Sequence, residues 1–89
     1  MESTQRRPES RADVLTRIGT EYLHRASPGT PSEVVKLPQG AGICVIQRTR
    51  GGGKVYVALD GTLLFVPSSM DFETGLAAFL AGERTAVAP

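Results

Sequence analysis

Two side chains of this 89-residue sequence could carry nucleophilic or acid–base chemistry, His24 and Cys44, and each is the sole residue of its type. A general base needs a nucleophile or a substrate proton within hydrogen-bond reach. Nothing in the sequence places the two residues together. Cys44 follows Ile43 and precedes Val45, an apolar setting that favours a buried, unreactive thiol. We therefore expect both residues to be structural and the protein not to be an enzyme.

Metal and phosphate motifs are also incomplete. One His, one Cys and scattered carboxylates do not make a recognisable ligand set, so we expect no metal and no cofactor. The glycines at 51–53 followed by Lys54 suggest a phosphate loop, but that motif requires Ser or Thr next and then a helix, and Val55 follows here. Arg48, Arg50 and Lys54 could still contact phosphates, so a nucleic-acid-binding module is one alternative function.

The composition limits the other classes of protein. Hydrophobic residues make up 40% of the chain, which is typical of a globular domain, and the formal net charge of +1 gives no overall field for nucleic acid or membranes. A single cysteine allows no intramolecular disulfide and favours a reducing compartment. No apolar run approaches the roughly 20 residues that span a bilayer. We expect a cytoplasmic protein that does not bind membranes.

Apolar residues recur at helical spacing near both ends of the chain. The first helix is expected to begin at Ser10, whose hydroxyl can accept a hydrogen bond from a first-turn N–H, and to end at the Pro- and Gly-containing segment 27–31. The second should be capped by Ser69 or Asp71 and end at Gly82.

Four short apolar or β-branched runs lie between the helices and predict strands. The expected fold class is α+β, an antiparallel meander of three to four strands flanked by an N-terminal and a C-terminal helix (α-β-β-β-β-α), with the helices packed mainly against one sheet face. Residues 10–84 should form one domain between a disordered tail at 1–9 and a frayed tail at 85–89. The expected strands are 32–37, 42–49, 54–59 and 62–66.

Asp60-Gly61 between the last two strands predicts a two-residue type I′ hairpin. That turn would pair Val57 with Leu64 and would place Tyr56, Leu63 and Phe65 together on the other face. Both faces of the hairpin would then be apolar. Two helices on one side would leave one of these faces for a partner, so the three residues are our candidate partner-binding anchors.

The stretch 55–80 runs VYVALDGTLLFVPSSMDFETGLAAFL: an apolar strand, an Asp-Gly turn, a second strand, Pro-Ser-Ser and a helix with an acidic start. It resembles the C-terminal half of the small α-β-β-β-α bacterial immunity proteins of polymorphic toxin systems. Those proteins neutralise toxins of competing cells by binding them, so the resemblance implies a binding function without catalysis.

The leading hypothesis is accordingly a non-enzymatic protein-binding domain, a toxin-neutralising or accessory subunit that acts through an apolar sheet face. Two alternatives stay open. One is the nucleic-acid-binding module described above, and the other is a homodimeric structural protein in which the sheet pairs with a second copy of itself.

Overall fold

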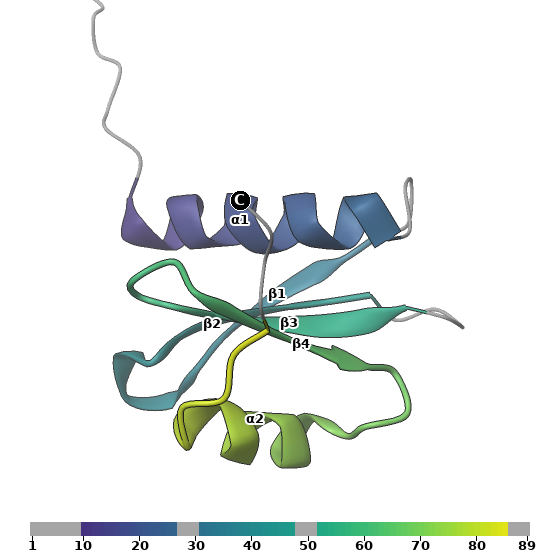
Figure 1. Ribbon diagram of the computed structural model, residues 1–89. Coiled ribbons are helices and arrows are strands. Elements are labelled where there is room, and N and C mark those ends of the chain that lie inside the picture. The colour runs from purple at the N-terminus through teal and green to yellow at the C-terminus, as the bar shows by residue number, and fades with distance from the viewer. Residues whose placement is uncertain (1–9, 27–30, 48–51, 86–89) are drawn as a thin grey trace, which may run out of the picture.

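A four-stranded antiparallel sheet lies between two helices, one on each face (Figure 1). The computed structural model describes residues 10–26, 31–47 and 52–85. The predicted α+β class and the element order are confirmed. The elements are α1 (Arg11–Ala26), β1 (Glu33–Lys36), the 3-10 turn η1 (Pro38–Gly40), β2 (Gly42–Ile46), β3 (Gly53–Ala58), β4 (Leu63–Pro67) and α2 (Phe72–Leu80).

Both helices begin where short polar side chains satisfy first-turn N–H groups. Ser10 Oγ accepts a hydrogen bond from Asp13 N–H (3.1 Å), and the Asp13 carboxylate accepts one from Ser10 N–H (3.4 Å). At α2 the Asp71 carboxylate accepts a hydrogen bond from Thr74 N–H (2.7 Å). Hydrogen bonding to Thr74 lowers the pKa of Asp71. Asp71, rather than Ser69, is therefore the cap of α2.

The strands follow one another in the order β1-β2-β3-β4, so β1 and β4 are the two edges of the sheet. Pro31 and Pro38 bracket β1, which agrees with the expected edge strand. The apolar strand β2 is central, as its lack of a polar face predicts.

The β3–β4 hairpin differs from the prediction by one residue in register. Ala58 N–H donates to Thr62 O (2.8 Å), Gly61 N–H donates to Ala58 O (2.9 Å), and Gly61 alone in this loop has a positive φ, of 90°. This is a three-residue loop over 59–61 in place of a type I′ turn. The Asp60 carboxylate stabilises it by accepting from both N–H and Oγ–H of Thr62 (2.9 and 2.6 Å).

The shifted register regroups the side chains of the hairpin. Val57 now pairs with Leu63 and Tyr56 with Leu64. The predicted pairing of Val57 with Leu64 is wrong, because a slip of one residue turns the side chains of one strand to the other face. Tyr56 consequently lies on the opposite face from Leu63 and Phe65.

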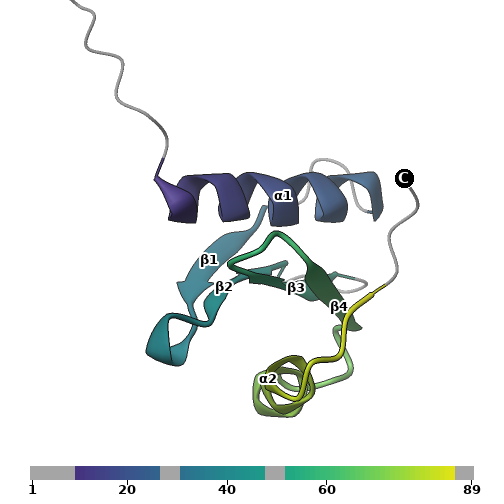
Figure 2. The same ribbon diagram turned by 60° about the vertical axis from the view of Figure 1, so that its left-hand side comes forward.

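The two helices cover opposite faces of the sheet, so the expectation that both pack mainly on one face is wrong (Figures 1 and 2). Each face has its own core. The α1 core contains Leu15, Leu23, Ile43, Val45, Val55, Val57 and Leu63. The α2 core contains Leu37, Cys44, Ile46, Tyr56, Ala58, Leu64, Val66, Leu76 and Phe79.

Each helix places a glycine against the sheet, which allows a close approach. A Cβ on Gly19 of α1 would lie 2.7 Å from Val45 Cγ2, and a Cβ on Gly75 of α2 would lie 2.5 Å from Tyr56 Oη. Both distances are too short for a methyl group. These two contacts therefore fix how near each helix lies to the sheet.

The chain after α2 returns to the edge of the sheet. Thr85 N–H donates to Leu63 O (2.8 Å), and Thr85 Oγ1 accepts from Phe65 N–H (2.8 Å). Thr85, the residue directly after the predicted domain boundary, is therefore bonded to the sheet. The expected tail at 1–9 and the rest of the expected tail at the other end lie outside the described residues.

Candidate functional site

The three anchors expected from the sequence do not form a surface. Tyr56 is 0% exposed, and its hydroxyl donates to Phe72 O (2.7 Å) while its ring packs between the rings of Phe72 and Phe79. Leu63 is buried and Phe65 half-buried on the α1 side. The expectation that they share one exposed sheet face is therefore wrong, because a helix covers each face.

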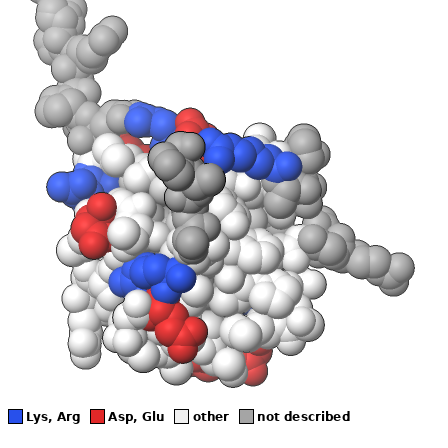
Figure 3. All heavy atoms as spheres, in the orientation of Figure 1, with Lys and Arg blue, Asp and Glu red and all other residues white. Residues whose placement is uncertain are grey.

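Of the three residues that the nucleic-acid alternative names, only Lys54 lies in the described part of the chain. Arg48 and Arg50 lie outside the described residues. Lys54 is half-buried, and its ammonium donates to Met70 O (2.6 Å), so it holds the β4–α2 connection onto the sheet. Figure 3 shows charges of both signs scattered over one face, with broad uncharged areas between them. No observation on the described residues favours nucleic acid.

Neither of the two candidate chemical residues has a catalytic setting. Cys44 is wholly buried at the centre of β2, and burial raises the pKa of its thiol from the ordinary 9.0 to about 12. His24 is exposed in the last turn of α1, on the other side of the sheet from the Cys44 side chain. Within the described part of the chain, no three His, Cys, Asp or Glu side chains could hold a metal ion together.

The helices described there are all too short or too polar to cross a membrane.

The outer edge of β1 is the main unsatisfied hydrogen-bonding surface of the sheet. Leu37 N–H donates to Gly42 O (3.0 Å), and bonded pairs alternate along an antiparallel ladder. Val35 therefore directs its backbone groups to β2, whereas Val34 and Lys36 direct theirs outward. Among residues 10–26, 31–47 and 52–85, nothing bonds to these outward groups. We call them the free edge.

The opposite edge of the sheet is partly covered by the chain that follows α2. Thr85 takes up the outward carbonyl of Leu63 and the outward N–H of Phe65 on β4. Arg84 fixes this segment, since it donates to Thr62 Oγ1 (2.9 Å) and Phe79 O (2.9 Å) and lies 4.1 Å above the Phe79 ring. Residues 10–26, 31–47 and 52–85 thus cover part of the β4 edge and make no bond to the outward groups of β1.

Neither helix covers β1. The face of α1 packs over β2 and β3, and α2 packs over β3. In the turned view of Figure 2, β1 and η1 lie to the side of α2. Val34, on the α1 side of β1, consequently stays 45% exposed.

A hollow lies beside β1 on each face of the sheet. The α1-side hollow has a volume of about 310 Å³, and Lys36 and Leu37 contribute to its wall. The α2-side hollow, of about 260 Å³, is lined by Val35, Ile46, Lys54 and Phe72. Successive residues of β1 therefore border hollows on opposite faces.

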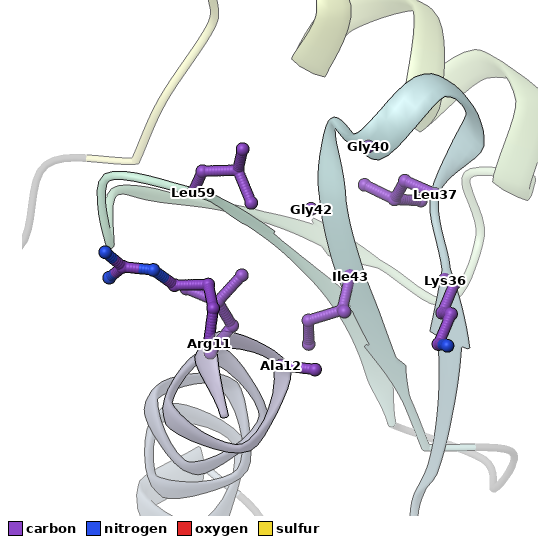
Figure 4. Close-up of a pocket in the computed structure, with 9 residues that line it drawn as sticks. Arg11, Ala12, Lys36, Leu37, Gly40, Gly42, Ile43 and Leu59 are labelled. Carbon is purple, nitrogen blue, oxygen red and sulfur yellow. The ribbon is translucent and has the colours of Figure 1, made fainter. Parts of the chain in front are cut away.

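The α1-side hollow combines an apolar wall with a basic rim (Figure 4). Leu15 and Ile43 line it from α1 and β2, and Leu59 reaches it from the β3–β4 loop. Arg11 and Lys36 stand on two sides of it, and no acidic residue is among those that line it. Leu59 is 52% exposed at a loop position that polar residues usually occupy.

Sequence reasoning identified β1 as an edge but did not associate it with binding. Leu59 was the available signal, an apolar residue directly before the Asp-Gly turn. Arg11 and Lys36 gave no signal, because they are 25 positions apart and come to line the same hollow only in the folded chain.

Comparisons with known proteins add no relative. No family model matches the sequence, and the searches found no similar curated protein and no similar solved structure.

Proposed function

We propose that this domain binds an extended segment of another protein, which adds to the sheet as a fifth strand along β1. The observation that carries the proposal is the difference between the two edges: Thr85 bonds to one outward C=O and one outward N–H of β4, while the outward groups of Val34 and Lys36 make no bond within the described residues. A toxin inhibitor and an accessory subunit, the two classes expected from the sequence, could both bind in this way.

The mode of binding differs from the one expected from the sequence. Because both sheet faces are covered by helices, an apolar face cannot serve as the docking surface, and the binding groups are instead backbone N–H and C=O groups. Val34 and Lys36 offer two donors and two acceptors. At about 0.5–1.5 kcal/mol net for each bond, they supply about 2–6 kcal/mol, which corresponds to dissociation constants between about 30 mM and about 40 μM before the entropic cost of association is subtracted.

Side-chain contacts must therefore add to the affinity. In strand addition, alternate side chains of the new strand face opposite sides of the sheet. The α1-side and α2-side hollows flank β1 on those two sides. Hydrogen bonds to the free edge would set the register of the added strand. Side chains of that strand that enter the two hollows would make the binding selective.

The test uses a displayed library of random 12-residue peptides selected on the full 89-residue chain. Selected peptides should bind the native protein and bind Val34→Pro at least tenfold more weakly, because proline removes an outward N–H that the fold does not use. Val34→Thr, which keeps that N–H, is the matched control and should bind within about twofold of the native protein.

Amide hydrogen exchange provides a readout without any substitution. Bound peptide should slow exchange at Val34 and Lys36, whose N–H groups point outward, and should change Leu37 little, because its N–H is already bonded to Gly42 O. Peptides that protect neither Val34 nor Lys36, or that bind Val34→Pro as well as the native chain, would refute binding at this edge.

A further inference from the structure

The α1-side hollow determines which segments the free edge accepts. Resting on the proposed function, we propose that the bound segment places a large apolar side chain in this hollow and carries a carboxylate beside it, between Arg11 and Lys36. The partner is thus an extended segment in which apolar and acidic residues stand close together. Three properties of the site lead to this assignment: its position, its wall and its rim.

The position of the hollow follows from the pleat of the sheet. Val34 and Lys36 point to the α1 side, since they pair with Val45 and Ile43 of the α1 core. A strand added along β1 would direct every second side chain to that same side. The residue beside Lys36 would then lie at the mouth of the hollow, because Lys36 itself forms part of the wall.

The wall calls for an apolar group of some size. Leu15, Ile43 and Leu59 come from α1, β2 and the β3–β4 loop and, with Leu37 after β1, line a volume of about 310 Å³. That volume is at the lower end for sites that take small ligands, so it fits a single large side chain better than a small one. Burying the exposed part of Leu59 would add to the apolar area removed from water.

The rim calls for a negative charge. Arg11 and Lys36 flank the opening from α1 and β1 (Figure 4). The nearest acidic residue of α1, Asp13, is engaged in the capping bonds with Ser10. Glu33 of β1 points to the other face, because it pairs with Ile46 of the α2 core. Among the residues that line the hollow, a carboxylate on the bound segment would therefore find a cation on either side and no anion.

A second copy of this chain fits the site less well. In antiparallel pairing of two β1 strands, each copy would present Ser32, Val34 and Lys36 on the α1 side. None of these is acidic, and Lys36 would add a third cation near the rim. The charges thus favour a different protein as the partner.

The experiment extends the peptide selection on the full-length chain. Selected peptides should share apolar residues spaced for one face and at least one Asp or Glu next to them. The affinity of one such peptide should fall about fivefold in Arg11→Glu and about fivefold in Lys36→Glu, with a further loss on raising salt. Arg25→Glu, an exposed charge reversal at the far end of α1, is the matched control and should change the affinity less than twofold.

The outcomes separate the two proposals. If peptides bind at the free edge but show no acidic preference, and Arg11→Glu behaves like Arg25→Glu, the assignment of the hollow is wrong while strand addition stands. If no peptide distinguishes the native chain from Val34→Pro, strand addition itself is wrong. A dimer in sedimentation analysis that Val34→Pro dissociates would overturn the assignment in favour of a second copy.

Discussion

Replacing Gly75 by alanine tests how α2 is held against the sheet. In an unhindered helix interior, Gly→Ala stabilises by about 1 kcal/mol. Here the new Cβ would lie 2.5 Å from Tyr56 Oη and 2.8 and 2.9 Å from two carbons of its ring. The ring cannot easily move aside, since its hydroxyl is bonded to Phe72 O and Phe79 stacks on it.

Overpacking of this kind costs about 1–3 kcal/mol, which more than offsets the helical gain of about 1 kcal/mol, so we expect Gly75→Ala to lower the free energy of unfolding by about 1 kcal/mol. Urea unfolding followed by circular dichroism should show a midpoint lower by about 1 M, given the slope of about 1 kcal/mol/M typical of a small domain. Ala77→Gly, at an exposed position of the same helix, measures the propensity alone and should cost about 1 kcal/mol.

A double-mutant cycle locates the cause of the loss. In a Tyr56→Leu background the ring is gone, and Gly75→Ala should then be neutral or stabilising, which gives a coupling energy of at least about 1 kcal/mol. If Gly75→Ala instead stabilises the native protein by as much as Ala77→Gly destabilises it, the close approach of α2 to Tyr56 is not a feature of the folded protein.

Three further predictions concern buried polar groups. Tyr56→Phe removes the hydrogen bond to Phe72 O and should cost about 1 kcal/mol, seen as a melting temperature lower by about 4–8 °C; an unchanged value would mean that the bond contributes nothing. Thr85→Val leaves the N–H of Phe65 without its acceptor and should cost about 1–2 kcal/mol, with faster amide exchange at Phe65 as the specific sign. Burial raises the pKa of Cys44 from 9.0 to about 12, so the neutral thiol's contribution is complete below pH 9 and is lost as the pH rises through the folded value. By pH 10.5 about 2 kcal/mol should be gone, and a Cys44→Ala variant should lack that part of the decline.

The elements of the fold could be predicted because their signals are local. The capping groups at Ser10 and Asp71, the prolines around β1 and the helical spacing of apolar residues each act within a few positions of the chain. Such signals do not depend on what packs against them. They fix where each element begins and ends, and the order of elements followed from them.

The hairpin register could not be predicted for a definite physical reason. Register is normally fixed by the requirement that one face of a strand be apolar. In β3 and β4 both faces are apolar, so the pattern accepts either register equally well. The loop then determines the register, because the Asp60 carboxylate accepts hydrogen bonds from Thr62 and stabilises a three-residue connection. A single side-chain contact therefore decides which residues share a face with Tyr56.

The location of the candidate site depends on which sheet face each helix covers. An apolar surplus on a sheet can be hidden by a partner or by helices on both sides, and the sequence does not distinguish these arrangements. Each helix covers one face and neither extends over β1, where the part of the chain that the structure describes makes no bond to the outward backbone groups of Val34 and Lys36. The covering of the faces therefore does not remove the case for binding. The binding site that we propose is instead the free edge of β1. The hollow beside it, with Arg11 and Lys36 on its rim, would favour partners that carry an acidic residue.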